Sequence, residues 1–504
     1  MPDILLATLN AQYSHASLGL RYLSANLGEL RSQAKLLEFT LEQRPIDVVE
    51  ALLAQQPKIV GLGVYIWNVA HTTEVVAMLK TVRPDVTIVL GGPEVSYECD
   101  EQRIVQLADY VIAGQGDHAF AALCRQLLSG ERPATKIIRA AVPKMDEVAL
   151  PYREYTDADI AHRLIYVEAS RGCPFKCEFC LSSLDQTAWP FQQDVFLAEM
   201  QLLYERGARH FKFVDRTFNL NVKASKRILE FFLERMADDL FVHFELIPDR
   251  LPEALKESIV KFPPGSLQFE IGVQTLNPDV QARISRKQDD AQTAENLRWL
   301  RAHTQAHLHA DLIIGLPGET LASFGAGFDR LAQLNPHEIQ VGILKRLRGA
   351  PIARHTQGFD MRYSPQPPYN ILSNADIDFS TMQRLQRFAR YWDMIGNSGR
   401  FVRTRELLLA DAPFERFLKF SDWLFAISRQ THRIALDRLY ELVFDGLVEL
   451  FIVDVEVLRD VLTRDYFESG ARGAPKFLNE PLAAALSSDA RAHAKRQARH
   501  RRAE

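Results

Sequence analysis

Short apolar runs alternate with amphipathic stretches along the first 140 residues of this chain. Runs of this length, separated by stretches of helical periodicity, predict buried strands joined by helices, and hence a parallel sheet covered on both faces. The strands are predicted at residues 3–9, 36–39, 59–64, 87–90 and 110–113, and the helices at 18–30, 45–55, 71–82, 101–108 and 118–129. Residues 1–140 are therefore predicted to form an N-terminal α/β domain with a doubly wound parallel sheet of flavodoxin-like type.

The same alternation resumes after residues 141–160, a linker in which Pro151-Tyr152 and mixed charge indicate a domain boundary. Six further strands, separated by helical stretches, are predicted at 164–168, 210–214, 241–247, 267–273, 307–314 and 339–344. Residues 161–355 are thus predicted to form a second α/β domain of repeated strand–helix units.

Amphipathic helices rich in aromatic residues follow, and they predict a mainly helical accessory domain over residues 366–480. An aromatic stripe of this kind is typical of a packed core rather than a ligand cage. The stripe comprises Phe388, Tyr391, Trp392, Phe414, Phe417, Phe420 and Trp423. The basic tail at 488–504 is predicted to be a disordered, solvated end rather than an RNA-binding segment.

Composition and net charge indicate which classes of binding partner this chain does not favour. The chain is 47% hydrophobic and 25% charged, and its net charge of −4 gives no general attraction to nucleic acid or to an anionic membrane. Its five cysteines do not suggest a disulfide framework. The longest apolar run, 59–70, is interrupted by Asn68 and is too short to span a bilayer, and the N-terminus lacks a basic signal-peptide region. We therefore expect a soluble cytoplasmic protein with no membrane partner.

Three of the five cysteines lie in the run Ser-Arg-Gly-Cys-Pro-Phe-Lys-Cys-Glu-Phe-Cys, at Cys173, Cys177 and Cys180. Three thiolates at C-x3-C-x2-C spacing can hold three irons of a [4Fe–4S] cluster and leave the fourth iron open to a small molecule. A structural zinc site with a fourth ligand elsewhere, or three unrelated thiols, are the alternatives.

With Phe179 before its last cysteine, this loop resembles the signature of the radical S-adenosylmethionine (SAM) enzymes. The resemblance implies a partial (β/α)6 TIM-type barrel for residues 161–355. It implies that the open iron binds the methionine part of SAM, which an electron from the cluster cleaves to a 5′-deoxyadenosyl radical. A low-potential electron donor such as flavodoxin or ferredoxin would be a partner. By position in the barrel, the SAM-binding residues would be Phe179, Asp215, Arg216, Gln274, Asp311 and Gly315.

The first domain resembles the cobalamin-binding domain that precedes many radical SAM barrels. Its predicted strand ends carry glycines, which permit close approach of a ligand to the backbone. The family's axial-histidine motif, Asp-x-His-x-x-Gly, is altered to Tyr-Ser-His-Ala-Ser-Leu-Gly around His15, so the identity of a lower cobalt ligand stays open. The resemblance implies cobalamin contacts from Tyr13, His15, Tyr65, Trp67, Gly91, Gly92, Pro93, Glu94, Gly114 and Gly116.

Together these features are similar to the class B radical SAM methyltransferases, in a bacterial branch with an uncharacterised C-terminal domain. We expect methylation of an unactivated carbon in a small-molecule or peptide substrate, with a [4Fe–4S] cluster, SAM and cobalamin as cofactors. Ring closure or rearrangement is an alternative outcome. RNA methylthiotransferase-like chemistry would need three more cysteines in the first domain, where only Cys99 and Cys124 occur. A non-catalytic protein that senses cobalamin or iron–sulfur clusters is the alternative from another class.

Overall fold

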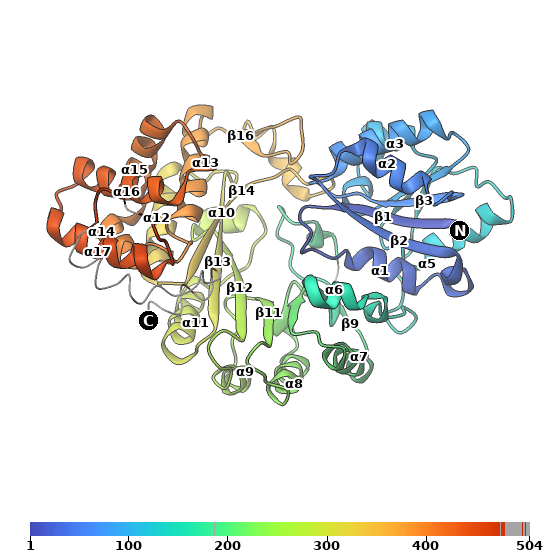
Figure 1. Cartoon of the computed structure of the whole chain (residues 1–504), viewed down its shortest axis with the longest axis horizontal. Helices are drawn as coiled ribbons and strands as arrows, with labels where there is room; N and C mark the ends of the chain where they lie inside the picture. Colours follow the sequence, from blue (N-terminus) through green and yellow to red (C-terminus); the bar gives the residue numbers. More distant parts are fainter. Residues whose placement is uncertain (186, 474, 479–495, 497–498, 500–504) are drawn as a thin grey trace.

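The computed structural model describes residues 1–185, 187–473, 475–478, 496 and 499. Figure 1 shows the first α/β domain at one side, a curved sheet with its helices in the middle, and a group of helices at the other side. The predicted fold class, with two parallel α/β units and a helical C-terminal region, is confirmed.

The first domain is a parallel sheet in the order β2-β1-β3-β4-β5-β6. Its strands are β1 (Ile4–Asn10), β2 (Ala34–Thr40), β3 (Ile59–Gly63), β4 (Thr87–Gly91), β5 (Tyr110–Ala113) and the unpredicted short edge strand β6 (Ile137–Arg139). All seven residues of β1 are buried, as expected for a strand covered on both faces. In this strand order, ligands bind where the connections from β1 and β3 diverge.

Two sets of helices cover this sheet. One face packs against α1 (Leu18–Ala25) and α5 (Asp117–Leu128), and the other against α2 (Pro45–Leu53), α3 (Val69–Val82) and α4 (Arg103–Leu107). The predicted helix 18–30 is wrong in its second half: α1 ends at Ala25, and the 3-10 turn η1 (Gly28–Gln33) follows. Gly28 has a φ of +58°, a backbone conformation that a right-handed α-helix cannot include, so α1 could not have continued through residue 28.

The second sheet has the order β14-β13-β12-β11-β10-β7, with every neighbouring pair parallel. Its strands are β7 (Ile165–Val167), β10 (His210–Phe213), β11 (Phe241–Leu246), β12 (Leu267–Gln274), β13 (His307–Ile314) and β14 (Glu338–Ile343). The helices between them are α7 (Gln193–Glu205), α8 (Val222–Leu233), α9 (Glu253–Ile259), α10 (Pro278–Arg283), α11 (Asp290–His303) and α12 (Leu321–Gln333). Strands in chain order that curve without closing make a partial barrel, as predicted.

Side chains alternate along the barrel strands between an apolar helix-facing side and a polar interior. Phe244 is buried in the helix-side core, whereas its neighbour Glu245 lines an interior cavity. Glu245 pairs in register with Glu270, which pairs with His309. The barrel interior is therefore a polar space rather than a filled apolar core.

The predicted linker is a packed part of the domain junction. It contains the turn η4 (Tyr152–Glu154) and helix α6 (Asp157–His162), and Tyr152 is fully buried. Arg21 of α1, 1% exposed, pairs across the junction with Asp159 at 2.9 Å and with Glu38 of β2 at 2.8 Å. Charges removed from water in this way are stable only when paired.

The C-terminal region is formed by α13 (Phe379–Met394), α14 (Val402–Leu409), α15 (Pro413–Ser428), α16 (Leu436–Leu450) and α17 (Val455–Glu468). Its aromatic stripe is core as predicted: Phe388, Trp392 and Phe417 are at most 2% exposed, and the Phe417 ring meets each of the other two edge to face. None of the helices described in the structure is both long and apolar enough to cross a bilayer.

The basic tail at 488–504 lies outside the described residues apart from 496 and 499. Arg496 pairs with Glu338 of β14 at 2.7 Å and with Asp393 of α13 at 2.9 Å.

The Arg21 cluster makes a prediction about stability. Arg21→Met retains most of the side-chain volume but leaves Glu38 and Asp159 without this partner, so the free energy of unfolding should fall by about 3 kcal/mol. Urea unfolding followed by circular dichroism measures the change. Arg44→Met, which removes an exposed pair with Asp47, should leave the transition where it is. An equal effect of both variants would contradict the prediction.

Candidate functional site

A cavity of about 440 Å³ opens between the strand ends of the first domain and the start of the barrel. Its glycine-rich wall includes five predicted residues, namely Tyr65, Gly91, Gly92, Gly114 and Gly116. Gly92 has a φ of +107°, and a Cβ there would lie 2.5 Å from the Val64 carbonyl oxygen. A side chain at this position is therefore excluded, and a ligand can approach the backbone closely. Leu20, Ile112 and Phe120 add an apolar side to the cavity.

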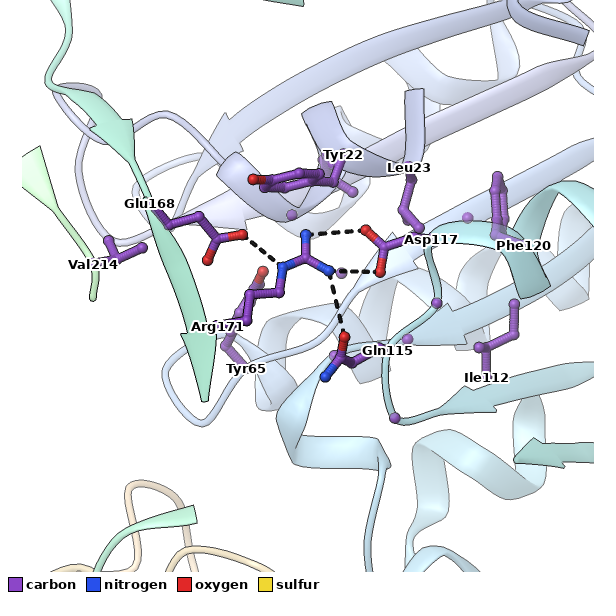
Figure 2. A pocket seen from close by; sticks show the side chains of 18 of the residues that line it. Tyr22, Leu23, Tyr65, Ile112, Gln115, Asp117, Phe120, Glu168, Arg171 and Val214 are labelled. Carbon is purple, nitrogen blue, oxygen red and sulfur yellow. Dashed lines mark hydrogen bonds and ion pairs between the residues drawn. The ribbon is translucent and has the colours of Figure 1, made fainter. Parts of the chain in front are cut away.

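The polar end of this cavity is organised by Arg171 (Figure 2). Its guanidinium donates to both carboxylate oxygens of Asp117 at 2.9 and 3.1 Å, and to Glu168 at 2.6 Å. It also lies 4.1 Å from the ring centroid of Tyr22. Arg171 belongs to β8 (Ser170–Gly172), which pairs with β9 (Ala188–Pro190) in a hairpin that the sequence did not predict. This arginine thus links the first domain to the base of the cysteine loop, residues 173–180.

Five other predicted cobalamin residues do not line this cavity: Tyr13, His15, Trp67, Pro93 and Glu94. His15 Nδ1 lies 2.5 Å from the Tyr166 hydroxyl, and the Trp67 ring stacks on Tyr65 with centroids 4.4 Å apart. Burial lowers the pKa of His15, helped by the charge of Lys212. That these five residues contact cobalamin stays a prediction.

A second cavity, of about 250 Å³, lies at the carboxyl ends of the barrel strands. Cys173, Cys177 and Cys180 all line it, together with Phe179. Arg286 lies with its Nη1 3.4 Å from Cys177 Sγ, within reach of a hydrogen bond to a thiolate. Within the described part of the chain, no three His, Cys, Asp or Glu side chains are grouped so that they could hold a metal ion.

Charges of both signs surround the cysteines. Arg216, Arg286 and Lys287 supply cations, and Glu245, Asp249, Glu270 and Asp311 supply carboxyl groups. Burial alone would raise the pKa of Glu270, but neighbouring His243 and Lys212 lower it to about 2. Burial and the charge of Glu270 raise the pKa of Asp311 well above its ordinary value.

Asp311 Oδ1 is buried and makes no hydrogen bond with the described residues, although it lies 3.7 Å from His309 Nε2. A buried oxygen of this kind requires a donor, which a ligand can supply. The three thiols do not meet at a single ion, but they line one cavity with a buried carboxyl group and charges of both signs. This arrangement fits a cluster that takes one thiolate per iron, with a charged ligand such as SAM beside it.

The predicted SAM-binding residues fall into two groups. Phe179, Arg216, Gln274 and Asp311 line the second cavity, and Gln274 sits at a strand bulge with a φ of +70°. A non-glycine residue in this conformation is costly and is often found at a functional site. Asp215 and Gly315 do not line the cavity.

Asp215 instead supports the segment before the cysteine loop. Its carboxyl group accepts hydrogen bonds from the Ala169 amide at 2.9 Å and the Ser170 hydroxyl at 2.7 Å. Burial raises the pKa of Asp215 to about 7. Gly315 packs against Ile371 and Met382, away from the cysteines.

The two cavities adjoin. Ser182 and Arg216 line both of them, so the strand ends of the first domain and the cysteine loop meet at one wall. Arg216 reaches this wall from the end of β10 and pairs with Glu245 at 3.2 Å.

Sequence reasoning missed several lining residues, notably Asp117, Arg171, Glu270 and Arg286. A signal was available for Glu270, because polar and apolar residues alternate in the run Leu-Gln-Phe-Glu-Ile, so its charged side chain must lie on a polar face of the strand. Arg171, next to the cysteine run, carried no such signal, because its partner Asp117 is 54 residues away.

Comparisons with protein-family models match three parts of the chain. Residues 4–124 match the B12 binding domain, and residues 167–331 match the radical SAM superfamily. Residues 357–503 match a family described as a protein of unknown function, DUF4080.

Individual relatives are distant. An uncharacterized methyltransferase, PH0819 of Pyrococcus horikoshii, is 24% identical over 332 residues, which cover 60% of this chain and 70% of that protein. The cobalamin-dependent radical SAM methyltransferase TokK of Streptomyces tokunonensis is 23% identical over 79% of this chain, an alignment that spans 62% of TokK. The structure of the cobalamin-dependent SAM radical enzyme OxsB with aqua-cobalamin superposes with a TM-score of 0.64 at 14% identity, over 97% of this chain and 84% of OxsB. This last match shows a shared fold.

Glu319, which follows β13, makes a prediction about pH. It is 1% exposed, its Oε1 accepts from Thr275 and Ser323, and burial raises its pKa from 4.5 to about 7. Because the folded state disfavours the charged form, ionisation of the unfolded chain above pH 4.5 should reduce stability until the folded carboxyl group ionises near pH 7. The free energy of unfolding of wild type, relative to Glu319→Gln, should therefore fall between these pH values. Denaturant titrations across this range measure the difference, and a constant difference would contradict the expectation.

Proposed function

Because this chain joins a B12 binding domain to a radical SAM domain and is homologous to cobalamin-dependent radical SAM methyltransferases, we propose that it methylates an unactivated carbon of a small-molecule or peptide substrate. The observation that supports this proposal most directly is the shared wall of the two cavities at Ser182 and Arg216. Hydrogen abstraction with SAM and methyl delivery from cobalamin would act on the same substrate carbon, so the two cofactor sites must lie next to each other, as these adjoining cavities do.

The first cavity would hold part of cobalamin. Its glycine wall, including Gly63, Gly91 and Gly92, leaves the backbone accessible, while Leu20 and Phe120 offer an apolar surface. Arg171 and Asp117 would orient polar groups of the ligand at the other end.

The second cavity would hold the [4Fe–4S] cluster on Cys173, Cys177 and Cys180, with SAM beside it. When bound, these cofactors supply hydrogen-atom abstraction and a methyl carrier, chemistry that protein side chains lack. The chain's own contribution is to hold them. Arg286 would neutralise charge near Cys177, and the buried carboxyl group of Asp311 would hydrogen-bond the ligand.

The substrate would enter beside the shared wall. Arg216 and Glu245 lie there as a partly exposed ion pair, so they would orient a polar part of the substrate or of SAM. Helix and barrel walls on the other sides would limit access of water to the reacting carbon.

RNA methylthiotransferase-like chemistry is disfavoured by the other two cysteines. Cys99 and Cys124 belong to separate apolar clusters on opposite faces of the first sheet, and they are 6% and 0% exposed. Burial raises the pKa of the Cys124 thiol to about 12, which disfavours the thiolate that a metal ligand needs.

Cofactor content tests the proposal. Anaerobic purification, cluster reconstitution and addition of hydroxocobalamin should give a brown protein with about four irons and one cobalt per chain. Metal analysis and the visible spectrum measure this. Iron without cobalt would exclude the methylcobalamin route, and absence of both metals would refute the proposal.

Cys177→Ala tests catalysis and separates an enzyme from a sensor. The variant should lose SAM cleavage, measured as 5′-deoxyadenosine formation under reducing conditions, because one iron loses its ligand. Hydroxocobalamin should still bind, with the affinity of the cluster-free protein, since the first domain is unchanged. Persistent cleavage in the variant would refute the cluster assignment, whereas a wild type that binds both cofactors without cleaving SAM would favour a sensor.

Arg171→Gln tests the polar end of the first cavity. Loss of the guanidinium leaves Asp117 without its partner and disorganises this wall, so the dissociation constant of hydroxocobalamin should rise about tenfold. Titration followed in the visible spectrum measures it. The control Arg125→Gln removes an exposed pair with Glu29 in the same domain and should bind like wild type. Unchanged affinity in Arg171→Gln would contradict the role of this residue.

A further inference from the structure

One short segment contacts both candidate cofactor loops. Residues 345–355, which we call the strap, follow β14 and connect the barrel to the C-terminal region. Figure 1 shows the chain beyond β14 running from the barrel toward the first domain. The Arg346 amide donates to the Tyr369 carbonyl at 3.1 Å, which ties the strap to the segment before β16 (Ile371–Ser373).

The first part of the strap binds the loop that follows β4. Arg346 donates to both carboxylate oxygens of Glu98 at 2.9 and 3.0 Å, and Arg348 donates to Glu94 at 3.0 Å. Glu94 is 3% exposed and also accepts from the Tyr369 hydroxyl at 2.8 Å. These carboxylates lie close in sequence to Gly91 and Gly92, which line the first cavity.

Gly349 permits this approach. Its φ is +80°, and a Cβ there would lie 2.3 Å from the Tyr97 ring. The strap thus lies directly against the loop after β4, and any side chain at Gly349 would push the two apart.

The last part of the strap binds the cysteine loop. Glu178, between Cys177 and Cys180, is 3% exposed, and Arg354 Nε donates to its carboxylate at 2.8 Å. His355 Nε2 lies 2.8 Å from the same oxygen, and the Ile352 amide donates to the Glu178 carbonyl at 2.9 Å. Ser285 donates to the other carboxylate oxygen at 2.6 Å, from the barrel side.

We propose that the strap is a positioning device that couples the cobalamin site to the cluster site, an inference that rests on the proposed function. The two anchor points are close along the chain: the Gly349 amide lies 3.3 Å from Glu98, and Ile352 contacts Glu178. Three residue steps span at most ~11 Å, so the strap cannot lengthen to let the loops separate. None of its own residues lines either cavity, so it acts through the loops it holds.

Such a device has a thermodynamic signature. A bound cluster would order the cysteine loop, and through the strap it would also order the loop after β4. The cluster should therefore tighten cobalamin binding. By linkage, cobalamin should strengthen cluster retention by the same factor. Couplings of this kind are commonly about fivefold or more.

The test compares hydroxocobalamin dissociation constants for the full chain before and after cluster reconstitution. Wild type should bind about fivefold or more tightly with the cluster in place. Arg346→Gln removes the two hydrogen bonds from Arg346 to Glu98, which Arg348 and the Gly349 amide still contact. Arg354→Gln removes the arginine contact to Glu178, which His355 and the Ile352 amide still contact. Each variant therefore weakens one anchor and should reduce this ratio. The matched control, Arg362→Gln, removes an exposed pair with Asp360 just beyond the strap and should keep the wild-type ratio.

A second measurement uses wild type alone and does not depend on the folding of any variant. Iron retention against a chelator is measured with and without hydroxocobalamin, and the equilibrium should shift by the same factor. A ratio of one in wild type, or a ratio retained in both strap variants, would overturn the coupling while both cofactors still bind. Failure of wild type to bind iron or cobalamin would refute the proposed function itself, so the two failures are distinguishable.

Discussion

The arrangement of this protein depends on the direction of its parallel strands. In each of the two six-stranded sheets all strands run the same way, so their carboxyl ends, with the loops that follow, lie along one edge. The first sheet presents glycine-rich loops at that edge, and the barrel presents the cysteine loop at its own. Because the cavities at the two edges share Ser182 and Arg216, the two domains present adjoining cavities at one place.

Ion pairs fix how the first domain and the barrel are placed where their cavities adjoin. Arg171 bridges Asp117 and Glu168, Arg21 bridges Glu38 and Asp159, and the strap arginines reach Glu94, Glu98 and Glu178. A buried or half-buried charge without a partner is costly, so the pairs that cross the junction, such as Arg171–Asp117, Arg21–Asp159 and Arg346–Glu98, disfavour arrangements in which the domains have moved apart. The apolar cores stabilise the individual domains, whereas these pairs specify how the first domain meets the barrel.

Much of the fold could be predicted from local pattern. The buried strands β1, β3 and β13 are continuous or alternating apolar runs, and such runs identify strands without tertiary information. The short elements were missed: β6 has three residues, and the β8–β9 hairpin encloses the cysteine loop with strands of three residues each. Strands this short carry too little periodicity to be distinguished from loop.

The sequence by itself determined the two sheet types, the helical C-terminal region and the three cysteines, because these depend on periodicity and on spacing within a few residues. Only the tertiary structure decided which strand-end residues share a cavity. It turned Asp215 toward the Ala169 amide and the Ser170 hydroxyl, directed Glu94 to Arg348, and brought Arg354 to Glu178 over 176 positions. The reason is physical: a buried polar group takes whichever partner the packed chain brings within hydrogen-bond distance, and that partner is not encoded in its neighbours along the sequence.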